Sequence, residues 1–150
     1  MIAKTTRSNW WEIVRFVIIT LVIVVPVRAY IAQPFIVSGL SMAPSFADGE
    51  YLIIDELSYL LREPKRDEVI VFHYPKDPSK FFIKRVVNLP GETVTIDNQS
   101  YTLGADEYFV LGDNRPMSLD SRVWGPVQKK LIKGRVFLRL FPFNRLAYLP

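Results

Sequence analysis

The stretch Ser38-Gly39-Leu40-Ser41-Met42-Ala43-Pro44-Ser45 opens the part of the chain that can form a globular domain, directly after an apolar N-terminal run. Pro44 fixes its own φ angle and favours an extended Ala43, while Gly39 lets the backbone approach another group closely. A serine in such a stiff turn of small residues is a candidate nucleophile, although many turns contain a serine without any chemistry. Ser41 therefore predicts catalysis only if the rest of the chain supplies a base.

Composition limits the kinds of base and site that are available. The chain has 150 residues, 49% hydrophobic and 23% charged, which suffices for one core. It contains no cysteine, which excludes disulfides, thiolate metal sites and a cysteine nucleophile. Its one histidine is His73, so a Ser-His-Asp triad would have to use that residue. The net charge of +4 is scattered and gives little indication of a nucleic-acid partner.

The chain is predicted to divide into an N-terminus over residues 1–9, a transmembrane anchor helix over 10–30 and one domain over 31–150. The 20 residues from Trp10 to Ala29 give about the length that crosses a hydrocarbon core of ~30 Å. Apolar side chains cover every face, which disfavours a buried core helix. A cleaved signal peptide is the stronger rival, but Ala29-Tyr30-Ile31-Ala32 has the wrong spacing for an A-x-A site. We therefore expect an uncleaved anchor.

Basic residues close to the apolar run predict its orientation. Lys4, Arg7 and Arg15 lie on the N-terminal side of the run, and Arg28 alone lies on the other side. The positive-inside rule then places the N-terminus in the cytoplasm. The expected location is the cytoplasmic (inner) membrane, crossed by a single pass, with the domain on the extracytoplasmic side.

After Pro34 the sequence changes to short apolar runs with a period of two, which is typical of strands. Strands are predicted at Tyr51–Asp55, Val69–His73, Phe81–Leu89, Glu92–Ile96, Tyr108–Leu111 and Arg135–Phe141. One short helix is predicted at Glu56–Leu61. Because no amphipathic crossover helices separate the strands, the predicted fold class is mainly β, with an antiparallel sheet.

The strand Phe81–Leu89 contains the best candidate for a base. Alternation places Lys84 on the same face as Phe82 and Arg85 on the opposite face of an otherwise apolar strand. A solvated edge lysine is the ordinary interpretation. The alternative is a lysine sunk in an apolar wall, where burial lowers its pKa from ~10.4 by several units. Such a lysine beside Ser41 would form a nucleophile-base pair without a histidine.

Residues 112–125 combine turn formers with opposite charges. The candidate ion pairs are Asp120 with Arg122, and Asp113 with Arg85 or Arg115. A solvated surface loop would account for this composition. The segment follows an apolar strand, however, so we expect it to be packed down and held by these pairs.

Three stretches together resemble the type I signal peptidases (leader peptidases), which are serine peptidases with a Ser/Lys dyad. They are Ser41-Met42-x-Pro44-Ser45, Lys84-Arg85-Val86-Val87 leading to Leu89-Pro90-Gly91-Glu92, and Gly112-Asp113-Asn114-Arg115-x-x-Ser118-x-Asp120-Ser121-Arg122-x-Trp124-Gly125. The resemblance runs from the anchor nearly to the C-terminus, and its third stretch is the most specific. Only 20 residues separate Gly91 from Gly112, where larger members carry an inserted second domain. The chain therefore resembles a minimal form.

The resemblance implies a role for each matching residue. Ser41 corresponds to the nucleophile and Lys84 to the general base. Ser118 corresponds to a serine that orients the lysine amine. Asp120 with Arg122 corresponds to a pair that buttresses the site, and Arg85 is expected to pair with Asp113.

The oxyanion and substrate sites are less completely specified. The backbone N–H of Ser41 is one expected oxyanion donor, but Gly39 stands where some members place a hydroxyl donor, so the second donor remains open. Pro116-Met117 replace polar residues often found there, which predicts a changed loop surface. The residues expected to bind substrate are apolar, namely Phe35, Ile36, Val37, Met42, Phe82 and Ile83.

The implied reaction is hydrolysis of signal-peptide-bearing preproteins after small-x-small (Ala-x-Ala-like) sites. Ser41 attacks the carbonyl, an acyl-enzyme forms, and Lys84 then activates water. The substrate would bind as an added strand on an open sheet edge. The expected partners are such preproteins and the lipid bilayer, with no metal, other cofactor or nucleic acid.

Other functions are compatible with parts of the sequence. A specialised maturation peptidase, of inner-membrane or pilus type, would carry the same motifs and differ in its substrates. A catalytically inactive membrane-anchored β scaffold is disfavoured by the presence of both Ser41 and Lys84. A self-cleaving repressor-type protein would need a DNA-binding helix-turn-helix where this chain has an apolar run. His73 receives no role from the resemblance, and a structural role for it is expected.

Overall fold

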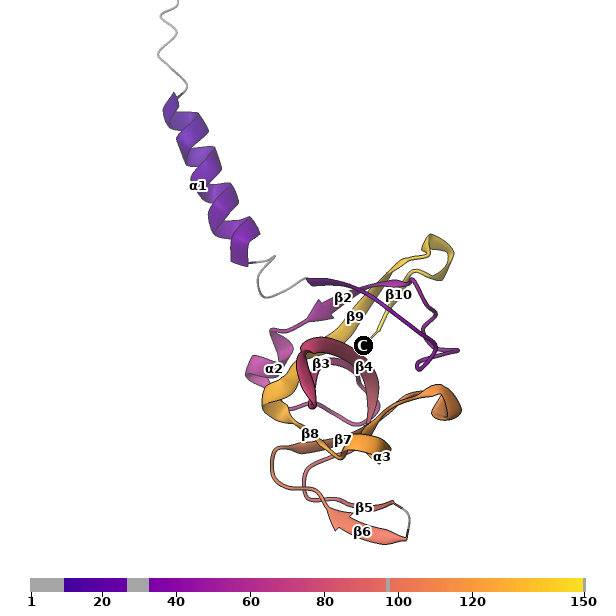
Figure 1. Ribbon diagram of the computed structural model, residues 1–150. Coiled ribbons are helices and arrows are strands. Elements are labelled where there is room, and N and C mark those ends of the chain that lie inside the picture. The colour runs from indigo at the N-terminus through magenta and orange to yellow at the C-terminus, as the bar shows by residue number, and fades with distance from the viewer. Residues whose placement is uncertain (1–9, 27–32, 97, 150) are drawn as a thin grey trace, which may run out of the picture.

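The computed structural model describes residues 10–26, 33–96 and 98–149 (Figure 1). Helix α1 spans Trp10–Pro26 and is followed by a mainly β domain. The strands of this domain are β1 (Gln33–Ile36), β2 (Tyr51–Asp55), β3 (Val69–Tyr74), β4 (Asp77–Asn88), β5 (Thr93–Ile96), β6 (Gln99–Thr102), β7 (Glu107–Leu111), β8 (Val127–Gln128), β9 (Ile132–Phe141) and β10 (Ala147–Tyr148). Its helical segments are α2 (Ser58–Leu61), η2 (Arg115–Met117), α3 (Ser121–Trp124), η3 (Lys129–Leu131) and η4 (Phe143–Arg145).

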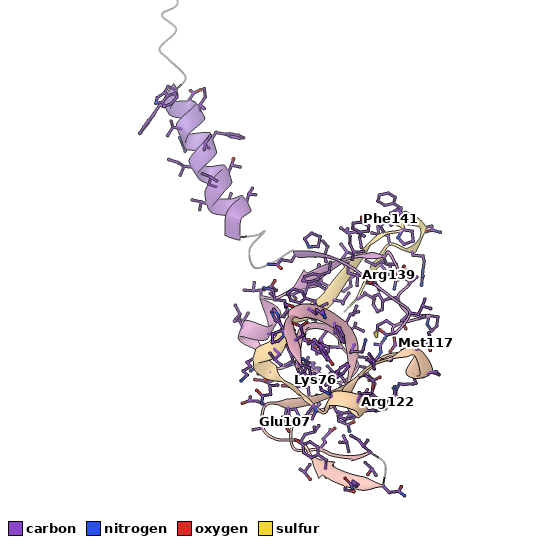
Figure 2. The ribbon with its side chains drawn as sticks, in the orientation of Figure 1. Lys76, Glu107, Met117, Arg122, Arg139 and Phe141 are labelled. Atoms are coloured by element: carbon purple, nitrogen blue, oxygen red, sulfur yellow. The ribbon has the colours of Figure 1, made fainter. Side chains whose placement is uncertain are left out.

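Helix α1 carries apolar side chains that are exposed along most of its length, and Figure 2 shows them projecting on all sides. Across residues 10–26, 33–96 and 98–149, none of the helices is both long enough and apolar enough to cross a membrane. The anchor expected over residues 10–30 includes residues 27–30, which lie outside the described part of the chain, as do residues 1–9.

Eight strands form one antiparallel sheet in the order β1-β2-β9-β3-β4-β7-β8, with β10 paired to β9. The expected mainly antiparallel β fold is therefore confirmed. The six predicted strands correspond to β2, β3, β4, β5, β7 and β9, and α2 is a shorter form of the predicted helix. The sequence does not predict β1, β6, β8 or β10, because these strands have two or four residues and lack a clear apolar alternation.

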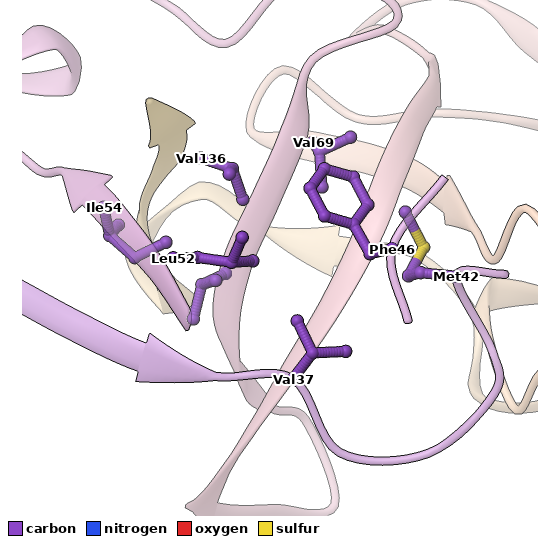
Figure 3. Packing of buried hydrophobic residues seen from close by; sticks show 8 residues of the cluster. Val37, Met42, Phe46, Leu52, Ile54, Val69 and Val136 are labelled. Carbon is purple, nitrogen blue, oxygen red and sulfur yellow. The ribbon is translucent and has the colours of Figure 1, made fainter. Parts of the chain in front are cut away.

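Strand β3 lies at the centre because both of its faces are apolar. Ile70 and Phe72 pack on one side in a cluster with Val86 of β4 and Val110 of β7. Val69 and Val71 pack on the other side in a second cluster. Figure 3 shows part of this second cluster, with side chains from β2, β3, β9 and the loop that follows β1. The loop that follows β1 and carries Ser41 is therefore attached to the main core.

The hairpin of β5 and β6 forms a separate two-stranded sheet and projects from one end of the domain in Figure 1. A third apolar cluster fixes its base, made of Val94, Leu103, Phe109 and Leu111. Gly91 begins this excursion with a φ of 81°, and its N–H donates to Leu103 O at 3.0 Å. The predicted turn at Asp97-Asn98 includes Asp97, which lies outside the described residues.

Two strand edges remain open on the side of the domain that carries the site. Strand β1 is the last strand of the sheet and, within the part of the chain that the structure describes, pairs only with β2. Strand β4 pairs with β7 only from Arg85 onward, so its segment Asp77–Lys84 has a partner only in β3 among the described residues. Unpaired backbone groups at such edges can accept an added strand.

Close packing of β9 against β2 predicts a sensitive glycine. A Cβ on Gly134 would lie 2.6 Å from Asp55 O and 2.7 Å from Ile54 Cγ2. We expect Gly134→Ala to lower the free energy of unfolding by about 1–3 kcal/mol, because overpacked cores must shift their backbone. Gly104→Ala is the control, since a Cβ there meets only the flexible Glu107 side chain, at 3.4 Å. Urea unfolding of the wild type and both variants in detergent measures this. Equal stability of Gly134→Ala and Gly104→Ala would contradict the expectation.

Candidate active site

Ser41 lies in the loop that joins β1 to β2. Backbone hydrogen bonds close the base of this loop, from Val37 N to Glu50 O and from Gly49 N to Val37 O, both at 2.9 Å. Met42 and Phe46 point inward from the loop and are buried in the core shown in Figure 3. These two side chains anchor the loop and leave Ser41 half-buried at its surface.

Lys84 of β4 points at this serine. Its Nζ lies 2.7 Å from Ser41 Oγ and also donates to Ile83 O at 2.9 Å. Only 4% of Lys84 is exposed, and its amine lies 5.5 Å from the centre of the Phe82 ring. The solvated edge lysine is therefore the wrong interpretation, and the buried lysine is the one observed.

Burial lowers the pKa of the Lys84 amine to about 8, because an apolar environment disfavours the charged form. The nearby carboxylates of Asp120 and Asp113 act in the opposite direction and raise the pKa, but by less. At this pKa roughly a tenth of the amine is neutral at pH 7, and the neutral amine can accept a proton from the Ser41 hydroxyl.

The segment that follows β7 packs directly under the serine. Asn114 N donates to the carbonyl oxygen of Ser41 at 3.0 Å. A Cβ on Gly112 would lie 2.5 Å from that same oxygen and 2.2 Å from Ser118 Oγ. Gly112 therefore permits a close approach that any larger residue would prevent.

Ser118 lies beside Gly112, but no hydrogen bond joins it to the Lys84 amine among the described residues. Its hydroxyl oxygen is buried, and no described residue meets hydrogen-bond geometry with it. It lies close enough to Asp120 to help lower the pKa of that carboxyl. Its role in orienting Lys84 thus has no hydrogen bond to support it in this structure.

Asp120 is fully buried and organises the loop beneath Ser41 and Lys84. Its carboxylate receives Arg122 Nε at 2.8 Å and Nη2 at 2.9 Å, and it accepts the backbone N–H of Gly112 at 3.1 Å. Burial alone would raise its pKa, but these hydrogen bonds outweigh it and hold the pKa below the ordinary range. Arg122 also donates to Arg115 O at 2.7 Å, which fixes the loop around η2.

Arg85 forms the pairing expected from the sequence. Its guanidinium binds Asp113 through two hydrogen bonds, of 2.8 and 2.7 Å, and donates to Asp67 O at 2.8 Å. A bidentate pair of this kind is geometrically specific. It holds β4 next to the residues that follow β7, and so fixes the strand of Lys84 relative to the loop under Ser41.

Two arginines that the sequence does not single out hold the nucleophile loop from behind. Glu50 is buried and receives Arg145 Nη1 at 2.7 Å, while Arg139 Nε lies 3.1 Å from its other oxygen. The same arginines donate to loop carbonyls, Arg139 to Ser45 O at 2.6 Å and Arg145 to Pro44 O at 3.3 Å. These contacts link residues about 95 positions apart, so no local pattern could have revealed them.

The backbone N–H groups around Ser41 differ in whether they already donate a hydrogen bond. The N–H of Ser41 makes no hydrogen bond to another described residue, whereas that of Gly39 donates to Asp48 Oδ1 at 2.7 Å. Gly39 has a φ of 87°, a conformation that L residues rarely adopt. A glycine at position 39 therefore permits this loop conformation, and its N–H is already used in the hydrogen bond to Asp48.

A cleft of about 490 Å³ leads away from Ser41 and Lys84 between β1 and β4. Five of the residues expected to bind substrate line it, namely Phe35, Ile36, Val37, Phe82 and Ile83. The sixth, Met42, does not: it is 0% exposed and packs in the core, because the turn directs it inward while Ser41 faces out. The lining also includes apolar residues that the sequence does not single out, namely Leu40, Leu52, Val71, Phe81, Met117 and Leu119. Figure 2 shows Met117 on the loop beside the cleft.

His73 lies away from the serine. Its Nδ1 is 2.6 Å from Pro78 O, and its ring packs against Phe81 with centroids 4.4 Å apart. Among the described residues it makes no hydrogen bond to Ser41. A Ser-His-Asp triad is therefore not formed, and a structural role for His73 agrees with these contacts.

The site thus places a serine hydroxyl against a buried amine beside a largely apolar cleft. A sequence model of the family described as signal peptidase, peptidase S26, matches residues 10–104 and 97–141. The chain therefore belongs to this family of serine endopeptidases.

Individual relatives agree with this membership. The chain is 31% identical to a probable signal peptidase I-2 of Synechocystis, over 95% of the chain and 78% of the relative. It is 33% identical to a signal peptidase I of Leptolyngbya laminosa, over 95% and 85%. It is 34% identical to mitochondrial inner membrane protease subunit 1 of Schizosaccharomyces pombe, over 77% and 78%.

The depressed pKa of Lys84 predicts how cleavage depends on pH. If the neutral amine is the base, kcat/KM for a signal-peptide substrate should fall about tenfold for each pH unit below about 8, and level off above it. The sign follows because protonation of the amine removes the base. A pH series of kcat/KM in detergent measures this, and a profile governed by a group near pH 6.5 would instead implicate a histidine.

Proposed function

We propose that the chain removes the signal peptides of exported preproteins by means of a catalytic dyad, with Ser41 as the nucleophile and Lys84 as the general base. The observation that supports this most strongly is the 2.7 Å hydrogen bond between Ser41 Oγ and the buried Lys84 Nζ. Membership of the signal peptidase family supports the substrate class, because the relatives named above include signal peptidases I.

The proposed reaction begins when neutral Lys84 takes the proton of the Ser41 hydroxyl and the serine oxygen attacks the scissile carbonyl. The N–H of Ser41 donates to the oxyanion that forms. Collapse of the tetrahedral intermediate releases the new N-terminal amine, which receives its proton from the Lys84 ammonium. Lys84, neutral again, then deprotonates a water that hydrolyses the acyl-enzyme, and Ser41 is regenerated.

The proposed cleavage site is small-x-small, of the Ala-x-Ala kind. The cleft beside the dyad is largely apolar and lies between two open strand edges, β1 and the first half of β4. A substrate strand placed between them would direct alternate side chains toward the same wall. We expect this cleft to accept only short side chains at the first and third residues before the scissile bond.

The proposed setting is the cytoplasmic membrane, which a single N-terminal helix would cross with the N-terminus in the cytoplasm and the β domain outside. The exposed apolar side chains of α1 and the basic residues before it support this. Exposed apolar side chains on a helix are costly in water and stable in hydrocarbon.

A specialised maturation peptidase is the second candidate. It is favoured by the 34% identity to mitochondrial inner membrane protease subunit 1, which is as high as the identity to the signal peptidases I. Cleavage of a panel of unrelated preproteins would favour general signal peptide removal, and cleavage of very few would favour the specialised role.

The dyad is tested by single substitutions. We expect Ser41→Ala and Lys84→Ala each to reduce cleavage of an Ala-x-Ala preprotein by at least about 10⁴-fold, because neither residue can act without the other. Lys76→Ala and Ser100→Ala are matched controls: Lys76 is exposed between β3 and β4 and does not line the cleft, and Ser100 lies on exposed β6. Both controls should stay within about twofold of wild type.

Single-turnover assays in detergent give these rates. Activity that survives in Lys84→Ala would remove lysine from the mechanism, and an inactive wild-type protein would remove the proposed function itself.

The absence of cysteine allows a clean test of topology. We expect a cysteine at Ser100 to react with a membrane-impermeant maleimide in intact spheroplasts, because β6 is exposed on the domain. A cysteine at Ser8 should react only after the membrane is permeabilised. Equal labelling of both positions in intact spheroplasts would contradict the proposed single pass.

A further inference from the structure

Two large apolar side chains on the loop that follows β7 line the cleft and are exposed. They are Met117 and Leu119, and each is 61% exposed. Figure 2 shows Met117 on this loop, away from the body of the sheet. Single exposed apolar residues are common on protein surfaces, but two on one wall of a cleft indicate contact with a bound molecule. We call Met117 and Leu119 the apolar ledge.

Backbone contacts fix the apolar ledge close to the reacting serine. Asn114 N donates to Ser41 O at 3.0 Å, and Met117 N in turn donates to Asn114 O at 3.1 Å. Leu119 follows Ser118, whose side chain lies next to the same carbonyl oxygen of Ser41. A substrate whose scissile carbonyl lies on Ser41 therefore has the ledge within reach of the residues around the bond.

The apolar ledge lies at the dyad end of the cleft. Along β4 the lining of the cleft ends at Lys84. The next residue, Arg85, pairs with Leu111 at the end of β7, so the loop after β7 begins beside the lysine. The opposite end of the cleft contains Phe81, three residues earlier on the same extended strand. A chain bound along the cleft thus passes the dyad before it reaches the ledge.

We propose that the apolar ledge binds the leaving part of the substrate, meaning the residues after the scissile bond, and favours an apolar side chain at the first or second of them. This rests on the proposed function, in which the acyl part of the substrate lies in the cleft between β1 and β4. The leaving part then extends past Ser41 over Met117 and Leu119. Because successive side chains of an extended chain point to opposite faces, one of these two residues faces the ledge. Covering the ledge removes apolar surface from water and so stabilises the bound substrate.

The ledge acts on only one half of the reaction. The leaving part departs when the acyl-enzyme forms, so a contact with it can speed acylation but not the later hydrolysis. A methyl ester of the same acyl peptide forms the same acyl-enzyme and releases methanol, without placing any residue on the ledge. The ester therefore separates a contact with the leaving part from a general effect on Ser41 or Lys84.

The experiment compares cleavage of matched peptides by the full-length protein in detergent. The parent peptide has an Ala-x-Ala site, and one series carries Ser or Leu at the first or second residue after the scissile bond. A second series makes the same exchange at the second or fourth residue before the bond. The protein variants are Met117→Ser, Leu119→Ser and the conservative Met117→Leu. Leu61→Ser is the matched control, because Leu61 is 83% exposed on α2 and does not line the cleft.

We expect wild type to prefer Leu over Ser at one of the two positions after the bond by about three- to tenfold in kcat/KM, because an open surface buries less of a side chain than an enclosed pocket does. Met117→Ser and Leu119→Ser should each reduce this preference to about twofold or less. The ratio of the rate on the Leu peptide to the rate on the methyl ester should fall by the same factor. Met117→Leu and Leu61→Ser should keep the wild-type preference.

A preference that is unchanged in both serine variants would overturn the ledge while leaving the dyad intact. An equal loss of activity on every peptide and on the methyl ester would also overturn it, because the loop would then only support Ser41. A change confined to the residues before the scissile bond would overturn it as well, since the substrate would then run in the opposite direction. Failure of wild type to cleave the parent peptide would overturn the proposed function, and the ledge with it.

Discussion

Keeping a lysine amine dry beside a serine hydroxyl is the constraint on which the other contacts of this site depend. Water would return the pKa of Lys84 to its ordinary value, so the amine must be buried, and a buried amine must still have hydrogen-bond partners. Ser41 Oγ and Ile83 O supply them. Burying the amine is unfavourable, and the apolar clusters on both faces of β3 offset this with their own burial. Strand β4, which carries Lys84, pairs directly with β3.

Ser41 and Lys84 come from segments 43 positions apart, and charged groups hold those segments in place. Arg85 with Asp113 ties the lysine strand to the residues after β7, and Asp120 with Arg122 folds those residues beneath the serine. Arg139 and Arg145 pair with Glu50 at the base of the loop that carries Ser41, and so hold this loop from its other side. Partly buried pairs of this kind give weak evidence for stability, but they fix one geometry, which the 2.7 Å hydrogen bond between Lys84 and Ser41 requires. The carboxylates also limit how far the pKa of Lys84 can fall.

Local pattern predicts the strands and the chemistry of this protein better than it predicts the surroundings of the site. Strand β2 has the bounds that alternation gives, and β3 is recognisable because every residue from Val69 to Phe72 is apolar. The same alternation places Lys84 beside Phe82 but cannot show whether that face is wet or dry, which depends on the fold. Met42 is misassigned to the cleft because a loop has no periodicity from which to read direction. The contacts of Arg139 and Arg145 with the loop join residues far apart in the sequence, so no single stretch encodes them.

The protonation state of Lys84 is the central claim, and it can be measured without any substrate. The ε-methylene carbon of Lys84 can be followed by ¹³C NMR through a pH titration of the full-length protein in detergent, with Lys84→Ala identifying its signal. The structure predicts a pKa of about 8. A pKa near 10.4, the value of a solvated lysine, would mean that the amine is charged at working pH, and it would contradict the dyad.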